Sequence, residues 1–406
     1  MKRIAQTLAV GLVCLLGAAS VFAQDWPQWR GTNRDGKVNG FTAPQAWPAQ
    51  LKQVWKTTVG FGDSTPALVG NNLYVFTRQG GEEVTLCLNA ATGDEVWRNH
   101  YEAQAVSGPA SSHPGPRSSI TVADGKIITL GVGGVLSCLD AASGKELWRK
   151  NDYSNAAPPF FVAMSPIVVD GMCVAHLGGK DKGAVIAYDL ASGDVKWKWD
   201  GDGPAYASPV LMTVEGVKQL VVQTEKNLLG VSVSEGKILW QVVTPPQGRS
   251  TNSATPIVDG QIIYYTGQGS GIKAVKIEKS GDAFTYKDVW SNANMNTDFN
   301  TPVLKDGWLY GLSSRGNLFC INAQTGQDAW VDTSRSDRFG AIVDAGSVLL
   351  ALPSTADLIA FKPNGNQYEE VARIKVSDTP IYATPIVAGK RIFVKDKETV
   401  ALLQIE

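Results

Sequence analysis

Few side chains in this sequence have the type and spacing that site chemistry requires. The three histidines, His100, His113 and His176, have no metal-ligand spacing to one another or to a cysteine. His176 lies in the apolar run 172–177 and is expected to be a buried core residue. No Gly-x-Ser-x-Gly elbow occurs, and no carboxylates have calcium-loop spacing. We therefore predict no catalytic residue and no metal site.

The cysteines are expected to pack rather than to react. Cys87, Cys138 and Cys320 occupy one position of a repeated motif described below, and Cys173 stands apart from it. Equivalent positions on packed sheets lie about 10 Å apart, beyond the roughly 7 Å that a disulfide can span between Cα atoms. The pattern predicts buried thiols.

Polar side chains that could bind a ligand concentrate in the segments between apolar strands. From these we predict a ligand-binding set, namely His113, Arg117, Arg249, Asn252, Asn300, Arg338 and Tyr382. The same segments contain Asp63, Tyr206, Asn294, Asp298, Arg335 and Asp378. Any one of them could instead cap backbone groups or face solvent. Arg117 directly precedes a strand start that lacks proline, so it could point toward the centre of the fold.

A repeated motif builds the elements that position these segments. It reads small-x-[Asp/Asn/Ser]-x-x-[Thr/Ser/Glu]-Gly-x-x-x-Trp, and its ungapped copies end at Trp97, Trp148, Trp197, Trp240 and Trp330. Looser copies end at Trp290 and at Ala372. The polar residue and the glycine make a tight turn, after which the second strand carries the tryptophan. Each motif predicts a β-hairpin.

A second hairpin precedes each motif, and the count of repeats decides the fold. It opens with Ser-Pro or Thr-Pro and often turns at Asp-Gly, as in the segment 165–171. Four strands per repeat is the blade of a β-propeller. The last repeat begins at Thr384 and ends before its fourth strand, whereas residues 51–57, with Trp55, have an outer-strand pattern without a hairpin.

The sequence thus predicts an all-β, eight-bladed propeller of four-stranded antiparallel blades over residues 51–406. The N-terminal strand closes the ring by pairing with the C-terminal blade, which hides two sheet edges. Residues 24–50 form an N-terminal extension. The seven repeat tryptophans, Trp55 included, are expected to pack between blades. The starts of the innermost strands are apolar, so we expect no charged, water-filled tunnel along the axis.

The first 23 residues have the pattern of a cleavable signal peptide. Lys2 and Arg3 precede the apolar run 4–19, and Ala23 ends a small-residue cleavage site. Cys14 follows a valine, whereas a lipoprotein signal has a small residue there, so a lipid anchor is disfavoured. We predict export to the periplasm or the exterior, and the later sequence contains no transmembrane pattern.

Charge excludes one class of partner. Lysine and arginine total 37 against 38 aspartates and glutamates, and no basic stripe occurs. Nucleic acid is therefore not expected as a partner. We expect a monomer.

The motif is similar to the pyrroloquinoline-quinone (PQQ) repeat, Ala-x-Asp-x-x-Thr-Gly-x-x-x-Trp, over essentially all of the mature chain. Residues 25–36 and 115–119 also resemble a group of exported bacterial PQQ-like propellers. That family includes quinoprotein dehydrogenases and the outer-membrane assembly lipoprotein BamB. The resemblance implies the fold but does not select a function.

Two functions follow from the resemblance. Many quinoprotein alcohol dehydrogenases carry adjacent, disulfide-bonded cysteines and calcium-binding carboxylates, and this shorter sequence has no Cys-Cys pair. We therefore predict no cofactor, with PQQ and calcium as a disfavoured alternative. The expected function is an exported, non-catalytic scaffold that binds a protein partner or a small ligand at its loop-rich face. The alternative is a PQQ-dependent dehydrogenase with a reduced cofactor site.

Overall fold

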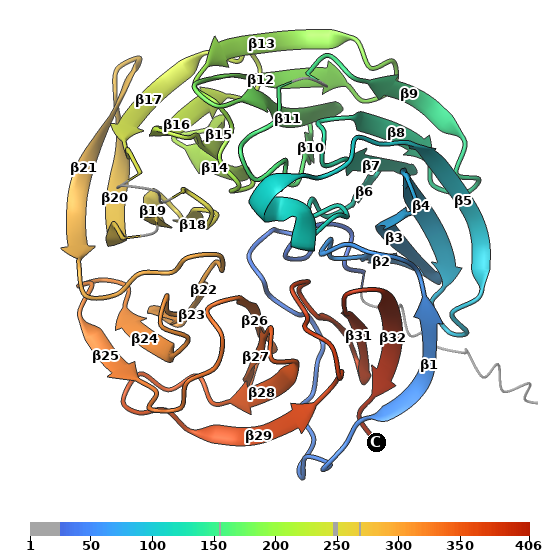
Figure 1. Ribbon diagram of the computed structural model, residues 1–406. Coiled ribbons are helices and arrows are strands. Elements are labelled where there is room, and N and C mark those ends of the chain that lie inside the picture. The colour runs from blue at the N-terminus through green and yellow to red at the C-terminus, as the bar shows by residue number, and fades with distance from the viewer. Residues whose placement is uncertain (1–24, 154–155, 247–250, 268) are drawn as a thin grey trace, which may run out of the picture.

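The computed structural model describes residues 25–153, 156–246, 251–267 and 269–406, so the predicted signal peptide lies outside it. Within these residues, eight four-stranded sheets form a ring (Figure 1). Every strand pairing in the ring is antiparallel, and each blade runs from a short strand at the centre to a strand at the rim. The predicted eight-bladed propeller is confirmed.

The strands fall into blades in chain order. Blade 1 comprises β2 (Ala67–Val69), β3 (Asn72–Gln79), β4 (Glu82–Asn89) and β5 (Glu95–Glu102). Blade 2 comprises β6 (Thr121–Ala123), β7 (Lys126–Leu130), β8 (Leu136–Asp140) and β9 (Glu146–Lys150), and the 3-10 helix η1 (Gly108–Ser112) precedes it. Blade 3 comprises β10 (Ile167–Val169), β11 (Met172–Gly179), β12 (Lys182–Asp189) and β13 (Val195–Gly201). Blade 4 comprises β14 (Val210–Val214), β15 (Val217–Gln223), β16 (Asn227–Ser232) and β17 (Ile238–Val243).

The second half repeats this plan. Blade 5 comprises β18 (Ile257–Asp259), β19 (Ile262–Gly267), β20 (Gly271–Ser280) and β21 (Ala283–Asn292). Blade 6 comprises β22 (Val303–Lys305), β23 (Trp308–Leu312), β24 (Leu318–Asn322) and β25 (Asp328–Val331). Blade 7 comprises β26 (Gly340–Asp344), β27 (Leu349–Pro353), β28 (Asp357–Phe361) and β29 (Glu370–Lys375). Blade 8 comprises β30 (Ile386–Ala388), β31 (Arg391–Lys395), β32 (Thr399–Gln404) and β1 (Lys52–Thr58).

The ring closes through β1, as the sequence predicts. β1 pairs antiparallel with β32 from Lys52 opposite Gln404 to Thr58 opposite Thr399. Because the chain then continues directly into blade 1, β1 belongs to the sheet of the last blade and is linked covalently to the first.

The motif's small residue and its tryptophan face each other across two strands. Trp97 pairs opposite Cys87, Trp148 opposite Cys138 and Trp330 opposite Cys320, each just before a β-bulge. An indole leaves room for only a small neighbour there, which explains why the position holds cysteine, alanine or glycine. All four described cysteines are free and buried. Burial raises the pKa of the Cys87 thiol to about 11 and that of the Cys138 thiol to about 12.

Six of the seven repeat tryptophans also join neighbouring blades. The indole Nε1 of Trp55 donates to the carbonyl of Ala90, 3.2 Å away in blade 1, and Trp97 donates to Ala141 in blade 2. Trp148, Trp197, Trp290 and Trp330 bond the following blade in the same way. Trp240 is the exception, because blade 5 lacks the regular turn and the indole bonds Gln219 in its own blade.

Hydroxyl groups at the inner-strand starts link most blades near the axis. The backbone N–H of Thr65 donates to Oγ of Ser119, and Ser119 donates to Ser165 in the same way. The chain of bonds continues through Ser208, Thr255 and Thr301, and Thr384 donates to Thr65. Blade 7 interrupts it, since Gly340 begins the inner strand there. The recurring Ser/Thr-Pro opening therefore holds adjacent blades together.

A segment that sequence reasoning left without a role crosses the centre of the ring. Residues 25–40, the hub segment, run through the middle of Figure 1. Backbone bonds join Trp26 to Leu68 in blade 1, Pro27 to Val122 in blade 2, and Val38 to Asp344 in blade 7. The hub segment thus contacts widely separated blades.

Two buried arginines anchor the hub segment on different sides of the axis. Arg34 donates to the carbonyls of Ser165 and Pro166 in blade 3, at 2.7 and 2.8 Å. Arg30 donates to those of Thr301 and Pro302 in blade 6, at 2.8 and 2.9 Å. Both side chains are only 4% exposed. The inner strands begin with apolar residues, as the sequence indicated, and the hub segment adds these two buried cations near the axis.

Candidate functional site

A cavity of about 630 Å³ opens at the loop face, where the loops that precede the inner strands gather. Its volume lies within the range of roughly 300–1,000 Å³ that is common for ligand sites. Trp29 and Arg30 of the hub segment contribute to its lining, together with residues of the loops before several inner strands. We call it the loop-face cavity.

One wall is an arc of aromatic rings. Phe299 and Phe339 stack with centroids 4.4 Å apart and planes 3° from parallel. Tyr382 meets Phe339 edge-on at 5.5 Å, and His113 meets Tyr382 edge-on at 4.8 Å. These rings come from the loops that precede blades 6, 7, 8 and 2, so the ring closure itself brings His113 beside Tyr382.

The second aromatic pair lies between blades 2 and 4. Phe160 and Tyr206 have centroids 6.2 Å apart, and the backbone N–H of Phe160 donates to the Tyr206 hydroxyl at 3.1 Å. Burial raises the pKa of the Tyr206 hydroxyl. The next residue, Phe161, turns away from the cavity and packs near Ala110 and Val132. Phe160 is exposed at the edge of the cavity, which we call the lip.

Arg117 holds the lip in place, and its charge remains beside the cavity. Its guanidinium donates to the carbonyls of Phe160 and His113, at 3.1 and 2.8 Å. Burial is the main cause that lowers its pKa, and Asp63 opposes this shift. Arg117 therefore lines the cavity and joins its own loop to the loop that carries Phe160.

His113 and Asp63 form a hydrogen-bonded pair on the cavity wall. Nδ1 of His113 lies 2.7 Å from Oδ2 of Asp63. The backbone N–H groups of Asp63 and Ser64 both donate to the Pro116 carbonyl, which locks the two loops together. Gly115 permits this approach, since a Cβ there would lie 2.1 Å from the Phe61 carbonyl oxygen.

The structure brings five of the seven predicted site residues to this cavity. They are His113, Arg117, Asn300, Arg338 and Tyr382. Asn300 is also structural, because its amide donates to the Leu312 carbonyl at 2.6 Å and accepts from the Leu312 N–H at 3.2 Å. Arg249 lies outside the described residues.

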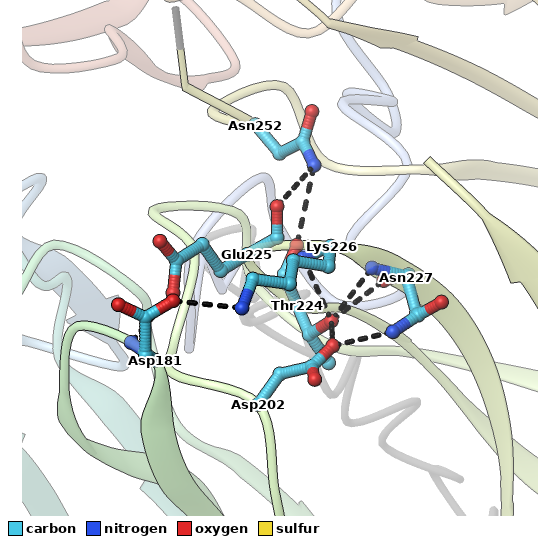
Figure 2. A network of polar contacts seen from close by, with 7 residues as sticks. All are labelled: Asp181, Asp202, Thr224, Glu225, Lys226, Asn227 and Asn252. Carbon is cyan, nitrogen blue, oxygen red and sulfur yellow. Dashed lines mark hydrogen bonds and ion pairs between the residues drawn. The ribbon is translucent and has the colours of Figure 1, made fainter. Parts of the chain in front are cut away.

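Asn252 points away from the cavity. Figure 2 shows its amide nitrogen directed at the backbone carbonyls of Thr224 and Glu225, at 3.3 and 3.1 Å. In the same network Asp202 accepts from Thr224 Oγ1 at 2.7 Å and from Asn227 Nδ2 at 2.5 Å. This network fixes the loop that follows β15, so Asn252 belongs to the scaffold of the face.

Sequence reasoning missed the floor of the cavity. Trp29 and Arg30 lie in the Trp-, Arg- and Gly-rich segment 25–36, whose similarity to other exported propellers was the only available signal. Phe299 and Phe339 were also missed, although each is adjacent to a residue of the polar loop set, Asp298 and Arg338. Asp63 and Tyr206 were in that wider set and do line the cavity.

The donors present fit a PQQ–calcium site poorly. Asp63 is the one carboxylate on the described lining, and it is bonded to His113. Nowhere in the described ranges do three or more His, Cys, Asp or Glu side chains gather as a metal ion would require. No helical segment of the described residues has the length and apolar character of a membrane span.

Comparison with known proteins agrees with the fold. The sequence is 24% identical over 372 residues to outer membrane protein assembly factor BamB of Yersinia pestis, covering 89% of this chain and 79% of that protein. It is 25% identical to quinohemoprotein alcohol dehydrogenase of Comamonas testosteroni over 223 residues, 46% of this chain but 31% of that enzyme.

Solved structures share the architecture at low identity. BamB from Moraxella catarrhalis superposes with a TM-score of 0.65 at 13% identity, covering 88% of this chain and 98% of that one. Quinohemoprotein alcohol dehydrogenase from Comamonas testosteroni gives a TM-score of 0.71 at 15% identity, covering 95% and 81%. The family model described as outer membrane protein assembly factor BamB matches residues 35–113 and 82–332. On that match, which spans most of the chain, the protein is a member of the BamB-like family of PQQ-repeat propellers.

Proposed function

We propose that this protein is an exported, non-catalytic binding propeller of the cell envelope, and that the loop-face cavity is its binding site for a protein partner or a small ligand. The observation that carries the proposal is a concave site with aromatic walls and three arginines, Arg30, Arg117 and Arg338. Aromatic and arginine side chains are the residues most enriched where proteins bind strongly. The family description and the signal-peptide pattern support an envelope location.

Photo-crosslinking in cells tests this proposal. We would place p-benzoylphenylalanine at Phe160 on the lip, and at Val243 on the outer strand β17 as a control, since both positions are exposed. If the proposal is right, the probe at Phe160 should crosslink to discrete partners, or a bound ligand should shield it from crosslinking. The probe at Val243 should show neither effect. Identical crosslinking at both positions would argue against a binding role for this face.

The second candidate is a PQQ-dependent dehydrogenase, which the similarity to quinohemoprotein alcohol dehydrogenases supports. The cavity has aromatic rings and arginines suited to a planar anion, but it lacks a carboxylate set for calcium. Titration with PQQ and calcium, followed by absorbance and dye-coupled alcohol oxidation, separates the two functions. Saturable binding with turnover would replace the scaffold proposal.

A further inference from the structure

The described lining of the loop-face cavity carries more positive than negative charge. Arg30, Arg117 and Arg338 face one carboxylate, that of Asp63, which is already bonded to His113. The Nη groups of Arg30 and Arg117 donate to backbone carbonyls, which do not cancel the charge of either side chain, and the buried Nε of Arg30 has no partner among the described residues. In a partly enclosed site such a charge is weakly screened and favours an anionic occupant.

Arg338 is the cavity arginine whose N–H groups are largely unbonded to the described residues. Nη1 lies 3.2 Å from Oδ2 of Asp298, and no described residue accepts a bond from Nε or Nη2. The side chain is 47% exposed, and its guanidinium carbon lies 5.2 and 5.5 Å from the ring centroids of Phe299 and Phe339. The stacked rings therefore hold a guanidinium whose remaining edge suits a carboxylate in a two-bond arrangement.

The rim extends the site beyond the volume of the cavity. Among the described residues, the exposed phenylalanines are Phe160, at 44%, and Phe299, at 38%, and both line the cavity. They come from the loops that precede blades 3 and 6, so they border the opening at separate places. A small molecule lodged at the floor would leave these rings in water, whereas a polypeptide could fill the cavity and cover the rim.

From this geometry we propose that the loop-face cavity binds an acidic segment of a partner protein. A carboxylate of that segment pairs with Arg338, and its flanking apolar side chains pack against Phe160 and Phe299. Arg30 and Arg117 supply the field that draws the acidic group inward. The inference rests on the proposed binding function and specifies the chemistry of its partner.

A peptide array followed by calorimetry tests the inference. The probes are end-blocked pentapeptides with Asp, Glu, Asn or Gln at the centre and aromatic or aliphatic flanks. We expect binding to the acidic members and a loss of about tenfold or more for their amide counterparts. Arg338→Gln should remove this preference, and Arg338→Lys should restore part of it, because lysine keeps the charge without the planar fork.

Arg335→Gln is the matched control. Arg335 lies in the same loop and bonds the Arg315 carbonyl, but it does not line the cavity. Its loss should leave peptide affinity unchanged. Equal binding of acidic and amide peptides, or an acidic preference that survives Arg338→Gln, would overturn the inference.

A further arm separates a peptide from a small acid. If free phenylacetate binds as tightly as the best peptide, the site recognises a small carboxylate and the partner segment is wrong. Crosslinking at Phe160 without any acidic preference would leave the binding function standing and remove only this inference.

Discussion

At the scale of single residues, five of the eight blade interfaces in the described structure contain a contact between a motif tryptophan and a motif glycine. The motif glycine of one blade has a positive φ and lies under the tryptophan of the preceding blade, as Gly144 does under Trp97. A Cβ at Gly144 would lie 2.3 Å from Cε3 of Trp97. The glycine therefore serves both the turn of its own hairpin and the packing of its neighbour.

Gly144→Ala separates these two roles when it is compared with Gly125→Ala. Their φ angles are 71° and 69°, but a Cβ at Gly125 would meet nothing within 4 Å. Both substitutions should cost about 1–2 kcal/mol for the left-handed backbone. Gly144→Ala should cost roughly 1–3 kcal/mol more, because the indole must move. Urea unfolding checks this, and equal losses would show that the indole contact contributes little.

His176 should make the fold sensitive to acid. Burial lowers its pKa to about 4 from 6.5, and its Nε2 lies 3.0 Å from the Asp202 carbonyl oxygen. Between these two pH values the unfolded chain binds a proton that the folded chain does not. Stability is therefore lost as the pH falls from about 6.5 to about 4, by roughly 3 kcal/mol in total.

Unfolding of His176→Gln at pH 7 and pH 4 measures this contribution. The substitution retains a side-chain donor, and the fall in unfolding free energy on acidification should shrink by about 3 kcal/mol relative to the native sequence. The exposed His100, which lies 3.0 Å from Glu82, is changed to glutamine for comparison, and the fall should change less there because exposed ion pairs contribute little to stability. An unchanged fall in His176→Gln would show that its proton does not couple to folding.

At the scale of elements, the repeat was predictable and the hub segment was not. Hairpins have a local signal, in which a turn residue, a glycine and a tryptophan stand at constant spacing. The hub segment has no periodicity, and Arg30 and Arg34 bond to backbone carbonyls that any sequence would provide. The loop residues of the site were found by their polarity. The direction of the Asn252 side chain could not be predicted, because its acceptors are also backbone atoms.

Truncation through residue 40 should leave a folded but weaker ring without a cavity floor. It removes Trp26, which is 3% exposed, and the arginine bonds to blades 3 and 6. Burial of one tryptophan alone contributes about 4–6 kcal/mol as an upper bound. We expect a lower Tm with retained β circular dichroism, compared with a chain that begins at residue 25. An equal Tm for both chains would mean that the hub segment is dispensable.

At the scale of the whole molecule, β1 supplies the strand that the eighth repeat lacks. All eight blades of the ring therefore have four strands. Trp55 then lies over Gly93 of blade 1, as four other motif tryptophans lie over the turn glycine of the next blade. Closure was predictable because one incomplete repeat stood at each end of the chain. The cavity was less predictable, since it arises where loops from distant repeats meet.

Truncation through residue 58 should therefore destabilise the ring more than truncation through residue 40 does. It removes β1 and Trp55, leaves β32 as an unpaired edge, and loses a tryptophan contact of about 3–5 kcal/mol. An open edge pairs readily with another chain, so we expect self-association in sedimentation velocity and a Tm below that of the shorter truncation. A synthetic peptide covering residues 51–58 should restore the monomer, because it can pair with β32, and the same peptide with Trp55→Ala should restore it poorly. The chain truncated through residue 58 could instead stay monomeric and have the same Tm as the chain truncated through residue 40. That result would show that the ring does not depend on this strand.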